Sequence, residues 1–263
     1  MTEDPAIPTY SHSKLETFRQ CPLKFKFRYI DGVETGIVGV EAFMGSRVHE
    51  TLHKLYQDVR GEKVSELDCL LEFYQSSWRS NWHERVRIVK RDMTEHQYFD
   101  SGAECIRNYY RENKPFNQAK TIALEQRVVC NLDKKGQRRF QGFVDRISSQ
   151  PGGAYEIHDY KTSRSVPTLR QLSDATHKDG VQLSLYQIAV THEHPEAKSV
   201  DLVWHYLSRG VTYRLRRKER ELTQILRNTI QLIERIESER RFAANKTQLC
   251  NWCEFREICP AWT

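Results

Sequence analysis

The 263-residue sequence has no long apolar run. None approaches the roughly 20 apolar residues that a membrane-spanning helix needs. The opening MTEDPAIPTYSHSK also has no apolar segment of the kind that marks a secretory signal. These absences argue against a membrane-bound or exported protein, and we expect a soluble, cytoplasmic one.

Two further absences narrow the class of protein. No phosphate-binding G-x-x-x-x-G-K-[ST] loop occurs, so any ATP-driven motion must come from a partner. There is also no internal repeat and no low-complexity linker. We therefore expect a single domain over residues 1–263.

The composition is that of a globular chain with a mild basic bias. Aromatic residues reach 11%, which argues against disorder, and 41 Lys and Arg against 35 Asp and Glu give a formal net charge of +6. The seven cysteines are an odd number. Without an export signal they are better explained as thiols or metal ligands than as disulfides. The charge bias weakly favours a polyanionic partner.

Hydrophobic periodicity divides the chain into three subregions. Residues 44–118 have a helical pattern, and 119–218 combine three strand-like runs, a helix at 181–194 and a hairpin that turns at Arg209-Gly210. Residues 219–263 hold a long amphipathic helix, to about 241, and a cysteine cluster. This order predicts an α/β fold, with a central mixed sheet flanked by helices and a helical N-terminal region.

The strand in YEIHDYKTSRS (155–165) ends in Asp159-Tyr160-Lys161. Alternation places Asp159 and Lys161 on one face, and on the preceding strand Phe143, Asp145 and Ile147 share a face. Asp145 can then lie beside Asp159. Two adjacent carboxylates repel unless a divalent cation lies between them, and Mg²⁺ or Mn²⁺ prefers such oxygen ligands. We expect Lys161 to orient or deprotonate a metal-bound water.

Four segments in the same order resemble the PD-(D/E)XK nuclease superfamily, in its RecB-like branch: GSRVH (45–49), GFVDRI (142–147), IHDYKTS (157–163) and QLSLY (182–186). The resemblance runs from about Tyr10 to Cys259 and implies a restriction-endonuclease-like core. It implies metal ligation by His49, Asp145, Asp159 and the carbonyl of Tyr160, with catalysis by Lys161 and support from Gln182 and Tyr186. Val144 stands where proline is usual. Glu125 is either an additional carboxylate near the site or an ordinary solvated side chain.

The C-terminal cysteines follow the pattern Cys250-x2-Cys253-x5-Cys259, and Cys21 has a comparable setting before a proline. Such a set fits a metal centre that ties the two ends of the chain together. Four thiolates suit zinc or a four-iron four-sulfur (4Fe-4S) cluster equally well. The arrangement resembles the iron-sulfur staple of AddB and of CRISPR-associated RecB-like nucleases, which favours the cluster. Cys69, Cys105 and Cys130 are interpreted as buried apolar residues.

The resemblance implies a metal-dependent DNA exonuclease that acts on ends or single strands, in repair and recombination or in CRISPR spacer acquisition. Its partners would be DNA and a helicase or the CRISPR adaptation proteins. Candidates for phosphate contacts are Arg85, Arg87, Lys90, Arg91, Arg214, Arg216, Arg217 and Lys218.

Two other functions remain open. One is a non-catalytic DNA-binding subunit. The other is a zinc protease, because His49-Glu50-x-x-His53 matches H-E-x-x-H, with Glu62 or Glu66 as a third ligand. In the nuclease interpretation His53 is a helix-surface or packing residue.

Overall fold

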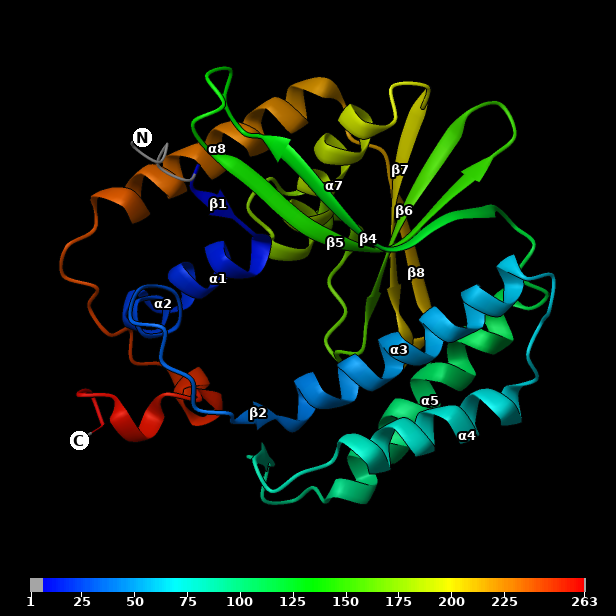
Figure 1. Cartoon of the computed structure of the whole chain (residues 1–263), viewed down its shortest axis with the longest axis horizontal. Coiled ribbons are helices and arrows are strands. Elements are labelled where there is room, and N and C mark those ends of the chain that lie inside the picture. The colour runs from blue at the N-terminus through cyan, green and yellow to red at the C-terminus, as the bar shows by residue number, and fades with distance from the viewer. Residues whose placement is uncertain (1–6, 263) are drawn as a thin grey trace, which may run out of the picture.

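The computed structural model describes residues 7–262, so the ends of the expected 1–263 unit, residues 1–6 and 263, lie outside the described residues. Its centre is a six-stranded mixed sheet (Figure 1). The strands are β1 (Thr9–Tyr10), β4 (Lys120–Asn131), β5 (Arg139–Gln150), β6 (Ala154–Lys161), β7 (Ser199–Tyr206) and β8 (Val211–Leu215). The predicted mixed sheet is confirmed, since β4–β5–β6 and β7–β8 are antiparallel while β1–β5 and β6–β7 are parallel.

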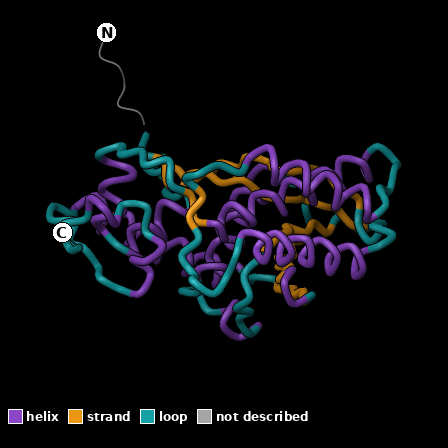
Figure 2. Tube along the Cα trace, turned by 90° about the horizontal axis from the view of Figure 1, so that it is seen from below, coloured by secondary structure: helices purple, strands orange, loops and turns teal. Residues whose placement is uncertain are grey.

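Helices cover both faces of the sheet (Figures 1 and 2). One face packs against α1 (His12–Gln20), α7 (Lys178–Glu193) and α8 (Glu219–Ser238) in one hydrophobic cluster. The other packs against α3 (Val40–Arg60), α4 (Leu67–Asn81) and α5 (Glu95–Asn113) in a second cluster. No helix in the described part of the chain is long and apolar enough to cross a membrane.

Short elements complete the chain. They are α2 (Pro22–Phe25), η1 (Lys26–Ile30), β2 (Val38–Gly39), β3 (Val86–Arg87), α6 (Leu169–Ser173), η2 (Leu207–Arg209), η3 (Gln248–Trp252) and η4 (Arg256–Ile258). The last two lie near the C-terminus, at one end of the long axis (Figures 1 and 2). The parallel pair β2–β3 links the segment just before α3 to the loop after α4, which periodicity could not bring together.

Local sequence signals explain several element boundaries. Ser11 caps α1 by accepting a hydrogen bond from the Lys14 N–H at 3.1 Å, as a serine directly before a helix commonly does. Gly210 turns the β7–β8 hairpin in the left-handed region, at φ 59°, where a residue without Cβ is favoured. The long C-terminal helix ends at Ser238, three residues before the predicted end, because Glu239 is extended.

The alternation of faces breaks on β5 at the position of Asp145. Val144 and Ile147 are three positions apart, so strict alternation would place them on opposite faces, yet both pack in the cluster on the α7 side. Phe143 is 56% exposed. The expectation that Phe143, Asp145 and Ile147 share a face is therefore wrong for Phe143. On the edge of β5 away from β4, β1 pairs only at 139–140 and β6 only from 146 onward. Asp145 lies between these partners, where the strand is free to turn.

A buried polar layer separates the sheet from α3 and α5. His158 on β6 stacks on His205 on β7, with ring centroids 5.3 Å apart. The Arg146 guanidinium donates to His158 Nδ1 at 3.0 Å and lies 4.0 Å from the Tyr56 ring centroid. Burial, followed by the charge of Arg146, lowers the pKa of His158 to about 3, so this imidazole is neutral.

Candidate active site

The ends of β5 and β6 bring the two predicted aspartates together. Arg146 pairs with His158, and continuing this register places Asp145 opposite Asp159. The strands separate at this point, and the Tyr160 N–H donates to Asp145 Oδ2 at 2.8 Å instead of to a backbone carbonyl. The strand backbone thus fixes the orientation of the Asp145 carboxylate.

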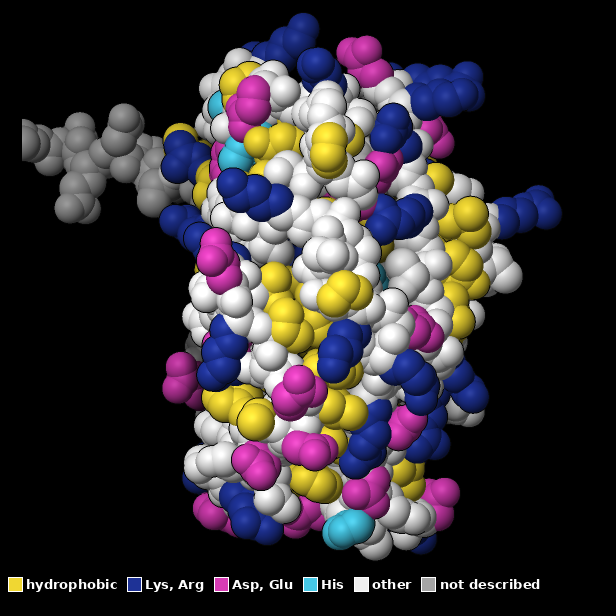
Figure 3. Space-filling view, turned by 90° about the vertical axis from the view of Figure 1, so that its right-hand side faces the viewer, with side chains coloured by type: hydrophobic (Ala, Val, Ile, Leu, Met, Phe, Trp, Pro, Cys, Tyr) yellow, Lys and Arg dark blue, Asp and Glu magenta, His cyan; other side chains and the backbone are white. Residues whose placement is uncertain are grey.

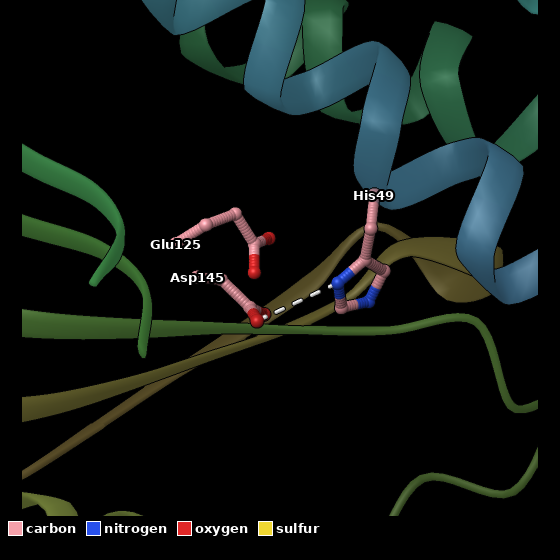
Figure 4. A group of neighbouring side chains, drawn as sticks. All are labelled: His49, Glu125 and Asp145. Atoms are coloured by element: carbon pink, nitrogen blue, oxygen red, sulfur yellow. Dashed lines mark ion pairs between the residues drawn. The ribbon is translucent and has the colours of Figure 1, made fainter. Parts of the chain in front are cut away.

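Helix α3 supplies His49 from the other side (Figure 4). Its Nδ1 lies 3.5 Å from Asp145 Oδ1, and its Nε2 donates to the Tyr160 carbonyl at 2.8 Å. Burial disfavours the imidazolium, but the Asp145 carboxylate outweighs burial and raises the pKa of His49 to about 9. The same contact holds the pKa of Asp145 below its usual range despite burial.

Glu125 on β4 completes this group, and its carboxylate points toward Asp145 and His49 in Figure 4. One ligand atom from each of His49, Glu125 and Asp145 lies within 4.8 Å of the others. The backbone of Glu125 is left-handed at φ 46°, a strained conformation for a side chain other than glycine. Burial and the Asp145 carboxylate raise the pKa of Glu125. The strained backbone of Glu125 and the repulsion between its carboxylate and that of Asp145 together indicate that a bound cation would stabilise this group of side chains.

Lys161 links Asp159 to α7. Its Nζ donates to Asp159 Oδ1 at 2.8 Å and to Gln182 Oε1 at 2.8 Å. Burial opposes the ammonium, but Asp159 and then Asp179 outweigh it, so the pKa of Lys161 lies above its ordinary value. For Asp159 the balance is reversed, because burial and the Asp145 charge together raise its pKa despite Lys161.

Tyr186 supports this arrangement from the next turn of α7. Its hydroxyl accepts a hydrogen bond from Gln182 Nε2 at 3.3 Å. Its ring packs on Gly142 of β5, where a Cβ would overlap the ring. Glycine is therefore required in GFVDRI for a steric reason, because Tyr186 fills the space that a side chain would occupy.

The predicted site residues on the sheet, α3 and α7 thus meet at one place, with two differences from the expected ligand set. The group that could hold a cation includes Glu125, which sequence left undecided, while Asp159 is engaged by Lys161. The sequence also provided no sign that His12 on α1 lies near Lys161. Burial and the charge of Lys161 lower the pKa of His12 to about 4. The register 124–146 and 126–144 places Glu125 opposite Asp145, but the sequence alone does not fix that register.

The H-E-x-x-H pattern does not form a metal group in the structure. Within residues 7–262, His53 is not part of the cluster of metal-ligating atoms around His49. Glu50 forms an ion pair with Arg47 and accepts a hydrogen bond from Ser77 at 2.7 Å. Neither suggested third ligand, Glu62 or Glu66, joins His49 and His53. The geometry therefore disfavours the zinc protease.

One pocket is lined by four cysteines: Cys21 near the N-terminus and Cys250, Cys253 and Cys259 near the C-terminus. The Asn245 N–H points to Cys21 Sγ at 3.4 Å, and the Thr247 N–H points to Cys250 Sγ at 3.4 Å. Backbone donors of this kind also surround metal-bound thiolates. Of the other cysteines, Cys105 and Cys130 are buried as expected, whereas Cys69 is exposed.

The spacing of these sulfur atoms bears on the choice of metal. Tetrahedral zinc, with Zn–S bonds of about 2.3 Å, requires sulfurs about 3.8 Å apart. Among the described residues no three cysteine sulfurs lie within 4.8 Å of one another. As they lie in the structure, these sulfurs therefore do not form a closed single-zinc site.

Hydrogen bonds join the cysteine segment to the helical subregion. Trp252 Nε1 donates to Glu41 Oε1 at 3.3 Å, and Tyr98 of α5 donates to the same oxygen at 2.9 Å. Arg87 of β3 donates to the Cys253 carbonyl at 2.7 Å. Glu41 lies in the first turn of α3, the helix that carries His49.

The arginines suggested for phosphate contacts mostly bind the protein itself. Arg214 pairs with Glu156, Arg216 contacts both oxygens of Asp201 at 2.6 and 2.8 Å, and Arg217 is 5% exposed. On the face shown in Figure 3, basic and acidic side chains are interspersed. Arg217 is thus a buried structural residue, whereas Arg214 and Arg216 are half-exposed and paired with acids.

Comparisons with known proteins agree with this geometry. The family model of the PD-(D/E)XK nuclease superfamily matches residues 9–260. No curated protein matches the sequence. The crystal structure of "Putative exonuclease" from Eubacterium rectale has the same fold, with a TM-score of 0.50 at 13% identity over 92% of this chain and 86% of that one. The crystal structure of SSO0001 aligns with a TM-score of 0.45 at 15% identity, over 100% of this chain and 90% of that one. The match over almost the whole length shows that the chain belongs to the PD-(D/E)XK nuclease superfamily.

Proposed function

We propose that the chain is a RecB-like, metal-dependent deoxyribonuclease that acts as an exonuclease on DNA ends or single strands. The observation that carries the proposal is the meeting of Lys161, Asp159, Asp145 and His49 where β5 and β6 separate. Carboxylates, a lysine and an imidazole at one point are the groups that phosphodiester hydrolysis with a divalent cation requires.

The ligands suit a hard cation. His49, Glu125 and Asp145 would hold it, with the Tyr160 carbonyl next to His49 and Asp159 next to Asp145. Mostly oxygen ligands favour Mg²⁺ or Mn²⁺, and the imidazole shifts the preference toward Mn²⁺. When bound, the cation supplies polarisation of the scissile phosphate and a bound water of lowered pKa.

Lys161 acts as a hydrogen-bond donor. Asp159 and Gln182 accept two of the three ammonium protons, which leaves one N–H for a phosphate oxygen. While Asp159 holds it, the Lys161 ammonium is charged and can stabilise negative charge on the phosphate, and next to a bound cation the same side chain can orient or deprotonate the attacking water. Gln182, supported by Tyr186, fixes the direction of the ammonium.

The cysteine pocket would hold a 4Fe-4S cluster on Cys21, Cys250, Cys253 and Cys259. Its role is structural, since it would tie residues near both ends of the chain to the helical subregion. The common pocket and the hydrogen bonds to sulfur support a metal centre on these thiols, and the choice of iron-sulfur over zinc rests on the resemblance of the cysteine pattern to the iron-sulfur staple.

We place the enzyme in the cytoplasm, in DNA repair and recombination or in trimming of spacers during CRISPR adaptation. A helicase or the adaptation proteins would then supply its DNA. This assignment rests on the resemblance of the motifs to the RecB-like branch.

Cleavage of end-labelled single- and double-stranded DNA by anaerobically purified protein tests the proposal. The reactions contain Mn²⁺, Mg²⁺ or EDTA, and Lys161→Ala is measured beside the wild type. We expect metal-dependent products from the wild type and none from the variant. DNA binding without cleavage at any metal concentration would instead support a non-catalytic subunit.

A further inference from the structure

Arg146 follows Asp145 on β5 and is a buried cation, only 5% exposed. Its guanidinium has few acceptors for its N–H groups. Nη2 donates to His158 Nδ1 at 3.0 Å, Nη1 lies 3.5 Å from Thr121 Oγ1, and Nε has no partner within residues 7–262. A buried charge costs free energy unless other groups stabilise it, so the remaining surroundings of Arg146 matter.

Tyr56 of α3 provides the missing stabilisation. The guanidinium carbon of Arg146 lies 4.0 Å from the centroid of the Tyr56 ring, which is a cation–π contact. Tyr56 is 1% exposed, so water is excluded from both partners and the contact belongs to the stronger ones of its kind. The Tyr56 hydroxyl bonds to the Tyr109 hydroxyl of α5 at 2.6 Å, which fixes the plane of the ring.

The contact between Tyr56 and Arg146 is a second attachment of α3 to the part of β5 that carries Asp145. Residues 49 and 56 are seven positions apart on α3, so they share a face and are separated by about 10 Å along the helix axis. His49 Nδ1 lies 3.5 Å from Asp145 Oδ1, and Tyr56 packs on the next residue of the strand. A single contact fixes only a distance, whereas two contacts along a helix also fix its direction and its rotation about its axis.

The tyrosine hydroxyls extend this attachment to β6. The Tyr109 and Tyr160 hydroxyls are 3.4 Å apart, and the centroids of their rings are 5.2 Å apart. The Tyr160 N–H donates to Asp145, and the Tyr160 carbonyl accepts from His49. The side chain of Tyr160 is thus held by the same buried layer whose backbone neighbours connect two of the candidate ligands.

We propose that Tyr56 and Arg146 are positioning residues for the cation, because their contact holds α3 at the distance from β5 at which His49 and Asp145 can bind one ion. The inference rests on the proposed nuclease function, which requires that ion. Neither residue belongs to the group of ligand atoms, so each acts through His49 and Asp145. Groups that orient metal ligands from behind change metal affinity by about 10–100-fold when they are substituted.

Binding of Mn²⁺ to the anaerobically purified protein without DNA, measured from the electron paramagnetic resonance signal of free Mn²⁺, tests this role. We expect Tyr56→Leu to weaken Mn²⁺ binding about tenfold, since it removes the ring and keeps an apolar side chain. Tyr56→Phe keeps the ring and should stay within about twofold of the wild type. Cleavage by Tyr56→Leu should recover at saturating Mn²⁺, because the ligands themselves are intact.

Two further variants separate positioning from general loosening of the fold. Arg146→Lys keeps the charge but lacks the planar group that lies on the ring, and it should weaken Mn²⁺ binding about threefold even if Tyr56→Leu does not fold. Leu55→Ala, a buried change on the same helix, is the matched control. It should lower Tm and leave Mn²⁺ affinity unchanged.

The outcomes distinguish this proposal from the nuclease function. Unchanged Mn²⁺ affinity in folded Arg146→Lys and Tyr56→Leu would overturn the positioning role, even if the wild type cleaves DNA. An equal loss of affinity in Leu55→Ala would overturn it as well, because loosened packing would then explain the effect. A wild type that binds Mn²⁺ but cleaves no DNA would contradict the nuclease function, while the affinities of the variants would still decide the role of Tyr56 and Arg146.

Discussion

The two candidate metal-binding regions of this protein are built in opposite ways. At the end of β5 and β6, each side chain is already positioned by the protein: Asp145 by a backbone N–H, Lys161 by Asp159 and Gln182. The cysteine pocket is assembled around Cys21 and the short turns η3 and η4, with half-buried thiols among side chains such as Phe27 and Phe255. A site within a sheet can be formed before its metal binds, whereas a site made of turns depends on the metal for its shape.

The largest expected effect, on the cleavage rate, comes from a substitution in the site at the ends of β5 and β6. We predict that Asp145→Asn lowers the cleavage rate by about a thousandfold or more, since a lost charged ligand removes roughly 4 kcal/mol of transition-state stabilisation. The fold should persist, because the amide still accepts from the Tyr160 N–H. Single-turnover cleavage and thermal unfolding of the same preparation check both parts. Glu193→Gln, a carboxylate at the end of α7, is the control.

Cys253→Ala should affect mainly the stability of the protein, in contrast to Asp145→Asn, which should affect mainly the cleavage rate. We predict loss of brown colour and a decrease in the free energy of unfolding of about 4 kcal/mol, or about 10 °C in Tm, because the pocket depends on its centre. Absorption spectroscopy, iron analysis and calorimetry measure these changes. Cys69→Ala, at an exposed cysteine outside the pocket, should change neither property. A colourless wild type of equal stability with one bound zinc ion would argue against the cluster.

Acid should weaken the sheet region specifically. His158 has a pKa of about 3 in the folded chain, against about 6.5 in the unfolded one. The folded state therefore binds fewer protons, and stability should be complete above pH 6.5 and decline as the pH falls toward 3. Its neighbours Arg146 and Glu156 remain charged through this range, and burial holds His205 neutral.

Urea unfolding midpoints at pH 7.5 and 5.0 measure this decline. His158→Gln should reduce the difference between the two midpoints, whereas exposed His96→Gln should leave it unchanged. An equal difference in both variants would assign the acid sensitivity to other groups.

The smallest effect is expected where the two regions meet. Trp252→Phe removes the hydrogen bond to Glu41 but keeps most of the ring, and we predict a loss of about 1 kcal/mol. Tyr98 continues to hold Glu41, so cleavage should fall only slightly. Calorimetry measures whether the hydrogen bond between Trp252 and Glu41 contributes to stability. Trp262→Phe, the same change at another C-terminal tryptophan, is the control.

The sequence predicted the class of fold because the strands carry strong alternation and the turns are short. It also predicted the aspartates, Lys161 and His49, which lie in compact motifs. It could not place Glu125, since the left-handed backbone at that residue and the break in alternation at Asp145 depend on three strands together. The ion pairs of the hairpin arginines could not be predicted for a related reason, because their partners Glu156 and Asp201 come from other strands.

The hydrogen bond between Glu41 and Trp252 also affects the order in which parts of the protein can fold during synthesis. The carboxylate at the start of α3 receives a hydrogen bond from Trp252, a residue synthesised more than two hundred positions later. While the nascent chain is still on the ribosome, the helix that carries His49 therefore lacks one of its anchors. The contact forms only after the cysteine segment has been synthesised, so one of the hydrogen bonds that hold the start of this helix is added late in folding.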